Sequence, residues 1–196
     1  MWPGSRSVVA VAVSVLALGG AAGCGGSTKP RPAPADTAPS NGTGTGTQSV
    51  PSDLQVPTSV PQRATGPAHS SSTRVIRRWL AALDRGDVRR AAHYFALPSK
   101  FQNAGTPVLH IDNEDERIAI NLSLTCGAKA ERTGGAGPYT IVLFRLVERS
   151  GPGGGCGAGT GGTARGAILV SGGLIREWYR LPDDPSAVPD QSGSSA

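Results

Sequence analysis

A long stretch with almost no large apolar side chains, residues 25–72, is the feature that most restricts how this chain can fold. It consists mainly of Gly, Ser, Thr, Pro and Ala. Such a segment cannot bury enough apolar surface to offset the entropy lost on ordering, so we predict a disordered linker over residues 24–72. Residues 183–196 have a similar composition and are predicted to be a disordered tail. One folded domain is therefore expected over residues 73–182, about 110 residues, a common domain size.

The N-terminal region has the layout of a secretory signal. One positive charge, Arg6, precedes an apolar run from Val8 to Leu18, and small residues follow. The run is shorter than the roughly 20 residues that a membrane-spanning helix needs. We therefore predict a cleaved signal peptide over residues 1–23.

The residues at the end of this signal, Ala21-Ala22-Gly23-Cys24, resemble the lipobox of bacterial lipoproteins of the actinobacterial type. The resemblance implies that Cys24 becomes the N-terminus of the mature protein and carries acyl chains such as palmitate. The protein would then be lipid-anchored at the extracytoplasmic face of the cell membrane. The alternative is ordinary cleavage in the same stretch, which would release a free secreted protein.

The chain has three cysteines, Cys24, Cys126 and Cys156. An exported protein meets an oxidising compartment, and lipidation of Cys24 leaves an even pair. We therefore predict a disulfide between Cys126 and Cys156. The sequence around these two cysteines holds no cluster of His or acidic residues, so no metal site is predicted.

The formal net charge is +5 and comes mainly from arginine. Export removes nucleic acid from reach, so we predict no nucleic-acid partner. Five arginines occur at spacings expected for the wet faces of two helices: Arg74, Arg77, Arg78, Arg89 and Arg90. A solvated face is the simpler interpretation, and contact with anionic lipid or wall polymer is the alternative.

Apolar periodicity divides the domain into helices followed by strands. A first helix is predicted from apolar residues at helical spacing, namely Val75, Ile76, Trp79, Leu80 and Leu83. Asp87 can cap a second helix that continues through Phe95 and Leu97 to Pro98. An extended segment over residues 107–111 and a third helix over 114–124, capped by Asp112 or Asn113, come next. The period then changes to two, which predicts strands over residues 126–132, 139–149, 163–171 and 174–181.

Two segments carry a family resemblance. Residues 79–87 (WLAALDRGD) and 173–178 (GLIREW) are similar to segments of the nuclear transport factor 2-like (NTF2-like) superfamily, which includes SnoaL-like and ketosteroid isomerase-like proteins. The resemblance implies an α+β fold in which N-terminal helices pack on a curved antiparallel sheet and form a cone with an apolar pocket. It also implies dimerisation through the outer sheet face. A ferredoxin-like sandwich and a cystatin-like sheet fit the order of elements less well.

The same resemblance suggests which side chains line a pocket. We expect these to be Trp79, His93, Tyr94, His110, Tyr139 and Trp178. His110 with Asp112, and His93 with Tyr94, are the acid–base candidates. Asp112 is explained more simply as a helix cap, so no catalytic residue is assigned.

From these residues we expect a non-enzymatic binding or accessory module without a cofactor. Its partners would be the membrane through the anchor, and a small apolar ligand, an envelope protein or a second copy of the chain. The alternative is an isomerase, dehydratase or cyclase that uses a pocket Asp or His.

A glycine-rich run over residues 151–162 contains a GxGxxG match at Gly157, Gly159 and Gly162. A dinucleotide site needs such a match between a strand and a helix, whereas a strand is predicted to follow here. We interpret the run as a long connection between strands, pinned by the disulfide. It would serve as a connector or as a rim of the pocket.

Overall fold

The computed structural model describes residues 51–188. The predicted signal peptide, Cys24 and residues 189–196 lie outside this range. The helices are α1 (Ser70–Asp84), α2 (Val88–Ala92) and α3 (Glu114–Ser123). The strands are β1 (Phe95–Gln102), β2 (Leu109–Ile111), β3 (Gly127–Ala136), β4 (Tyr139–Val147), β5 (Thr163–Ser171) and β6 (Leu174–Leu181). Short 3-10 helices cover Ser52–Leu54, Gly157–Gly159 and Pro185–Ala187.

Local sequence features account for the end of α1 and for the beginnings of α2 and α3. The chain leaves α1 through Gly86, whose φ of 73° is in the left-handed region that favours glycine. Asp87 caps α2 by accepting a hydrogen bond from the backbone N–H of Arg90 at 3.2 Å. Asn113 caps α3 by accepting from the backbone N–H of Glu116 at 3.0 Å. Of the two caps considered for α3, Asn113 therefore fills the role.

The prediction that the second helix extends to Leu97 is wrong. The helix α2 ends at Ala92, and Phe95 and Leu97 belong to strand β1. This strand pairs antiparallel with β2 on one side and parallel with β6 on the other. Phe95 and residues 99–102 pair with these neighbours, and this pairing gives the extended backbone hydrogen-bond partners. The apolar spacing alone did not distinguish a helix from a strand.

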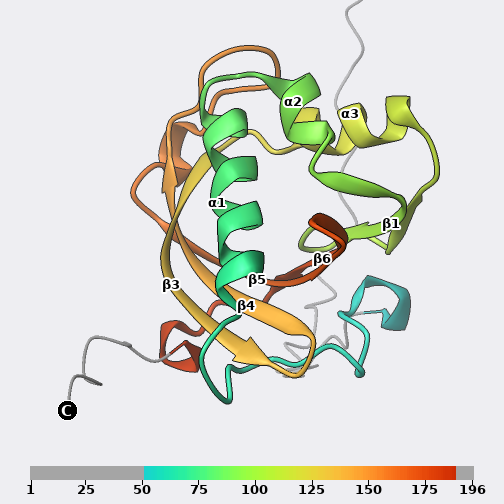
Figure 1. The fold of residues 1–196 in the computed structure, drawn as a ribbon. Helices are drawn as coiled ribbons and strands as arrows, with labels where there is room; N and C mark the ends of the chain where they lie inside the picture. The colour runs from blue at the N-terminus through green and yellow to red at the C-terminus, as the bar shows by residue number, and fades with distance from the viewer. Residues whose placement is uncertain (1–50, 189–196) are drawn as a thin grey trace, which may run out of the picture. The chain divides into compact units, whose positions relative to one another are not determined.

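The six strands form one curved sheet in the order β2-β1-β6-β5-β4-β3. Neighbours are antiparallel except β1 and β6, so the sheet is mixed rather than wholly antiparallel as predicted. Figure 1 shows α1 lying along the strands on one face, with α2 and α3 at one end of the sheet. The predicted α+β class, with helices packed on a curved sheet, is confirmed.

The apolar side chains form one cluster on each face of the sheet. The inner cluster lies between α1 and the sheet and includes Ile76, Trp79, Leu80, Leu83, Phe95, Phe101, Val142, Phe144, Ile168, Ile175 and Trp178. The outer cluster lies on the opposite face and consists of Val60, Ala136, Ile141, Leu143, Ala167, Tyr179, Leu181 and Val188. Both faces are therefore buried, and this explains why apolar residues occur on both sides of the last strand.

A bulge decides which residues of β6 face inward. Leu169 pairs with Glu177 while the next residue, Val170, pairs with Ile175, so Arg176 is an extra residue in β6. Ile175 and Trp178 consequently lie on the same face, in the inner cluster. The strict alternation predicted for this strand had placed them on opposite faces.

The outer face is covered by residues 56–68, which we call the strap. Val60 in the strap is 3% exposed and belongs to the outer cluster. The backbone N–H of Thr65 donates to Gly135 at 2.8 Å, and that of Gly135 donates to Gly66 at 2.7 Å. A Cβ on Gly135 would lie 2.3 Å from the carbonyl oxygen of Pro67, so only glycine allows the backbones to approach this closely.

These contacts correct the predicted domain limits. Residues 51–72 were assigned to a disordered linker, but the strap is hydrogen-bonded to β3. Residues 183–188 were assigned to the tail, but Val188 is fully buried and the backbone of Ala187 accepts a hydrogen bond from Ala64 at 3.0 Å. The described structure thus extends beyond both predicted ends, because a few apolar side chains and backbone hydrogen bonds are enough to order these segments.

Candidate functional site: an apolar cavity under helix α1

A cavity of about 190 Å³ lies between α1, the connection from α3 to β3, and strands β4, β5 and β6. Most of its lining is apolar, and its polar members lie after β1, at and after the end of α3, and near the end of β6. The lining residues are Trp79, Leu80, Leu83, Asn103, Ser123, Leu124, Thr125, Cys126, Ala128, Phe144, Leu146, Ala164, Trp178 and Arg180.

Packed aromatic rings support one wall of the cavity. Trp79 from α1 meets Phe95 and Trp178 edge-on, with ring centroids 5.6 and 6.5 Å apart. Phe101 stacks on Trp178 at 4.6 Å. Such geometries are favourable for aromatic rings and restrict their motion. The cavity is therefore bounded by a preorganised wall.

A buried hydrogen bond fixes the orientation of Trp79. Its indole N–H donates to Oδ1 of Asn121 at 2.9 Å, and the side-chain amide of Asn121 donates to the backbone carbonyl of Arg117 at 2.8 Å. Asn121 is fully buried, so its polar atoms need these partners. Helix α3 thereby holds α1 in place over the cavity.

Arg180 is the single charged residue that lines the cavity among residues 51–188. Its guanidinium donates to both carboxylate oxygens of Asp183, at 2.9 and 3.1 Å. The positive charge is thus paired within the chain. No carboxylate or imidazole of the described residues belongs to the lining.

Asp84 lies close to the cavity without lining it. Its carboxylate accepts a hydrogen bond from the backbone N–H of Ala128 at 3.0 Å, and Ala128 is a lining residue. Burial raises the pKa of Asp84 above its ordinary value, against the opposing effects of this hydrogen bond and of the charges on Lys129 and Arg85. The carboxylate therefore joins α1 to β3 and is not part of the cavity lining.

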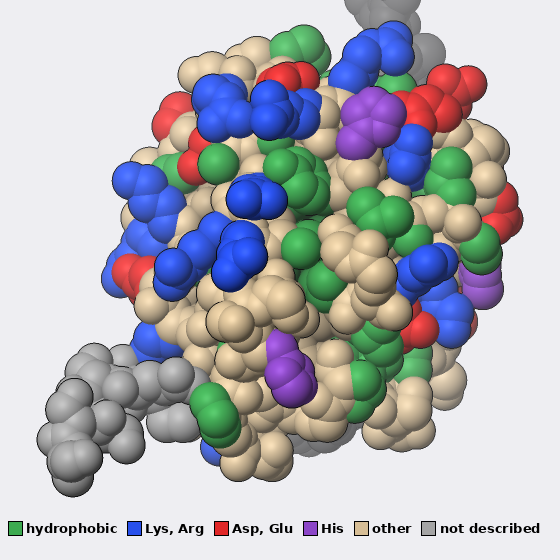
Figure 2. Space-filling model, viewed as in Figure 1, with side chains coloured by type: hydrophobic (Ala, Val, Ile, Leu, Met, Phe, Trp, Pro, Cys, Tyr) green, Lys and Arg blue, Asp and Glu red, His purple; other side chains and the backbone are tan. Residues whose placement is uncertain are grey.

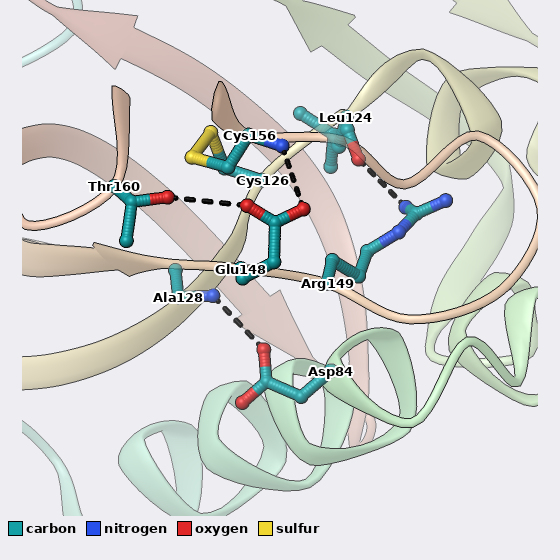
Figure 3. Close-up of a disulfide and its surroundings, with 8 residues drawn as sticks. All are labelled: Asp84, Leu124, Cys126, Ala128, Glu148, Arg149, Cys156 and Thr160. Atoms are coloured by element: carbon teal, nitrogen blue, oxygen red, sulfur yellow. Dashed lines mark hydrogen bonds between the residues drawn. A yellow bond between two sulfur atoms is a disulfide. The ribbon is translucent and has the colours of Figure 1, made fainter. Parts of the chain in front are cut away.

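The predicted disulfide between Cys126 and Cys156 is confirmed. Cys126 lines the cavity, while Cys156 lies in the β4–β5 loop, residues 148–162. Figure 3 shows Glu148 beneath the disulfide, accepting hydrogen bonds from the backbone N–H of Cys156 at 3.1 Å and from the hydroxyl of Thr160 at 3.2 Å. The bridge therefore ties the glycine-rich loop to the rim of the cavity.

Arg149 makes a second connection between this loop and the rim. Its guanidinium donates to the backbone carbonyls of Asn121 at 2.8 Å and Leu124 at 2.6 Å, and also to that of Pro152. The side chain is 3% exposed, and burial lowers its pKa. The carbonyls at the end of α3 are the negative pole of that helix. A cation here both satisfies them and holds the α3–β3 connection.

Trp79 and Trp178, two of the six residues predicted to line a pocket, are lining residues. The other four lie elsewhere: His93 is exposed after α2, Tyr94 packs against the edge of the inner cluster, His110 is exposed on β2, and Tyr139 packs on the outer face. For these four the structure corrects the prediction. His93 and Tyr94 lie between α2 and β1, and His110 and Tyr139 lie on β2 and β4, so none of these four side chains belongs to the cavity lining.

The two acid–base pairs are not assembled around the cavity. His110 and Asp112 are both exposed, on and after β2, and His93 is exposed at the end of α2. Tyr94, the fourth member of the two pairs, packs at the edge of the inner cluster. Tyr139 belongs to neither pair; it donates to Glu177 at 2.5 Å on the outer face, and burial raises the pKa of its hydroxyl. These groups thus lie in separate parts of the described structure and not in the cavity lining.

Several lining residues were missed by sequence reasoning. Leu124 and Thr125 lie in a connection, and Asn103 and Arg180 are polar residues at strand ends. Neither periodicity nor composition marks them. They line the cavity only because β1, β6 and the α3–β3 connection approach one another in the folded structure.

Two features are absent from the described part of the chain. Within residues 51–188 there is no group of three or more His, Cys, Asp or Glu side chains that could hold a metal ion. In the same residues no helix combines the length and apolarity that crossing a membrane requires.

No protein-family model matches the sequence, and no curated protein matches it significantly. Solved structures do match. An NTF2-like protein from Cytophaga hutchinsonii is 10% identical with a TM-score of 0.44, over 59% of this chain and 93% of that one. A proposed ketosteroid isomerase from Kribbella flavida is 14% identical with a TM-score of 0.43, over 64% of this chain and 88% of that one.

A proposed polyketide cyclase from Sinorhizobium meliloti is 13% identical with a TM-score of 0.43, over 58% of this chain and 100% of that one. Because these TM-scores are below 0.5, we base no argument on them.

Proposed function

We propose that this chain is a lipid-anchored extracytoplasmic module that binds a small apolar ligand in the cavity under α1. The observation that carries the proposal is the lining itself: a largely apolar space, bounded by ordered aromatic rings, without an unpaired charge among the described lining residues. Apolar surface removed from water is the main source of affinity in such a site.

The volume limits the size of the ligand. An apolar cavity of about 150 Å³ can accommodate benzene, so a cavity of about 190 Å³ fits one aromatic ring or a short branched aliphatic group. Pockets for larger ligands usually measure about 300–1,000 Å³. We therefore expect a compact ligand, or the terminal group of a longer molecule.

Chemistry on a bound ligand needs an acid or base within hydrogen-bond reach. The predicted isomerase, dehydratase or cyclase would use a pocket Asp or His, and residues 51–188 supply neither to the lining. The carboxylate of Asp84 is bound to the backbone of Ala128. The cavity therefore supports ligand binding better than it supports catalysis.

The proposed anchor rests on the lipobox-like residues before Cys24. Two acyl chains give stable attachment where a single chain gives only marginal binding. Cys24→Ala should release the protein from the membrane fraction, as measured by fractionation and immunoblotting. Retention of this variant in the membrane fraction would contradict the anchor.

The cavity is tested by filling it. Ala164 is 6% exposed and lines the cavity, so Ala164→Leu places three additional carbon atoms in that space. Ala81→Leu makes the same change on the exposed face of α1 and serves as the matched control. Native mass spectrometry and calorimetry with toluene and indole as probes would measure binding.

We expect both probes to bind the parent chain and the control. The Ala164→Leu variant should bind them at least about tenfold more weakly, because about 1.4 kcal/mol of lost contact changes an affinity tenfold. Equal binding by the two variants, or none by the parent chain, would refute the cavity as a ligand site.

A further inference from the structure

Arginine side chains cover the face of α1 that is turned away from the inner cluster. Arg74, Arg77, Arg78 and Arg85 follow one another at intervals of three, one and seven residues, while the buried residues lie on the opposite side of the helix. Arg89 and Arg90 extend the array onto α2. All six are exposed. We call this surface the arginine face.

The carboxylates that these two helices supply are engaged elsewhere. Asp84 accepts from the backbone of Ala128, and Asp87 caps α2. Within residues 51–188, Arg74, Arg77 and Arg78 form no ion pair. Figure 2 shows Lys and Arg side chains gathered over the α1 face, with Asp and Glu mainly at its margins.

A surface adapted only to solvent usually intersperses charges of both signs. Here one sign prevails over two consecutive helices, and its carrier is arginine. Guanidinium groups bind phosphate oxygens in pairs, with better geometric match than an ammonium group. The arginine face therefore has the charge and the donor chemistry to bind phosphate-bearing partners.

The shape of the face indicates an extended partner. Arg74 to Arg85 spans about 16 Å along the helix at ~1.5 Å per residue. Arg74, Arg77 and Arg78 line one open hollow on α1, and Arg85, Arg89 and Arg90 continue the array beyond it. Such an arrangement suits many anionic groups distributed over a plane better than it suits one small anion.

We propose that the arginine face binds the anionic phospholipid headgroups of a membrane surface. The inference rests on the proposed lipid anchor, which would keep the domain close to one leaflet and raise its effective concentration there. Each arginine near an anionic surface adds a modest attraction, and several together orient the domain with α1 toward the headgroups.

The test uses the processed chain without its lipid, residues 25–196, which retains both apolar clusters. Flotation measures binding to vesicles of phosphatidylcholine with 30% phosphatidylglycerol and to vesicles of phosphatidylcholine alone, at low and high salt. The matched variants are Arg77→Glu on the arginine face and Arg176→Glu on β6, which is also exposed. Both change the net charge by the same amount.

We expect binding to anionic vesicles, loss of binding at high salt, and little binding to neutral vesicles. Arg77→Glu should weaken vesicle binding by at least about fivefold, since roughly this factor is associated with each basic residue at an anionic surface. Arg176→Glu should have a much smaller effect. The triple variant Arg74→Glu, Arg77→Glu, Arg78→Glu should abolish binding.

Equal losses from Arg77→Glu and Arg176→Glu would overturn the proposal, because net charge alone would then explain binding. Binding to soluble polyphosphate without binding to vesicles would also overturn it in favour of an anionic wall polymer. The anchor is tested separately by Cys24→Ala in cells. Failure of vesicle binding with an intact anchor would remove this inference alone.

Discussion

The two faces of the sheet are covered in different ways. The inner face lies under an amphipathic helix and a group of aromatic rings, and it retains a cavity. The outer face lies under the strap and under Val188, which contribute small and β-branched side chains from segments without regular helix or strand. Strand residues of the outer cluster are well buried despite this modest cover.

This difference shows how little apolar surface is needed to order a chain segment when its backbone is also hydrogen-bonded. The strap gains order from Val60, from two glycines of β3 that permit close approach, and from backbone bonds to Gly135. It also occupies the sheet face predicted for dimerisation. A dimer through that face would require the strap to move.

The largest expected effect is on the inner face. Trp79 is 2% exposed, contacts two other rings and donates a buried hydrogen bond. Trp79→Ala should lower the free energy of unfolding by about 4 kcal/mol, as measured by urea titration. Val75→Ala, at a half-buried position on the same helix, should lower the free energy of unfolding by about 1 kcal/mol. Similar losses for the two variants would show that the aromatic wall does not dominate the inner face.

The disulfide beside the cavity should have the next largest effect. It closes a loop with a sequence separation of 30 residues, which corresponds to about 3.5 kcal/mol in the chain-entropy model. Cys126→Ser and Cys156→Ser should therefore lower the free energy of unfolding by similar amounts, and reductant should lower that of the parent chain equally. Markedly unequal effects of the two variants would argue against a stabilising role of the bridge.

The strap can be tested through its buried valine. Val60→Ala should cost about 2 kcal/mol in unfolding free energy, because two buried methyl groups are lost and a small cavity remains. Thr58→Ala at an exposed position of the same segment should change the free energy by less than about 0.5 kcal/mol. If Val60→Ala is as neutral as its control, the strap does not stabilise the outer face.

The smallest expected effect is a change in pH dependence at the margin of the inner face. Burial raises the pKa of Asp84 above 3.8, so the folded state binds this proton more tightly than the unfolded chain. The protonated Asp84 therefore contributes fully to stability at pH values below its pKa in the unfolded chain. This contribution declines as pH rises through the window from that value to the higher pKa of the folded state.

Asp84→Asn keeps an acceptor for the N–H of Ala128 and removes this titration. The unfolding free energy of the variant minus that of the parent chain should increase as pH rises through that window, and then level off. Urea titrations at several pH values measure this difference. A difference that is constant or that decreases with pH would show that burial does not govern the carboxyl group.

Much of the fold followed from local patterns in the sequence. The stripe of Ile76, Trp79, Leu80 and Leu83 predicted α1, and two-residue alternation predicted β5 and β6 with the limits that the structure has. The helix prediction succeeded because the residues of its one buried face recur at helical spacing along the sequence. The disulfide followed from cysteine count and compartment, which require no knowledge of distance.

Contacts between residues distant in sequence determined the features that local patterns did not predict: β1, the strap, the inward face of β6 and the cavity. Whether Phe95 continues a helix or begins β1 depended on β6, which lies eighty residues later in the chain. The strap became ordered through a strand far from it in sequence, and the bulge at Arg176 set the inward face of β6. The cavity is likewise a property of packing, because its lining comes from separate elements whose approach no local pattern encodes.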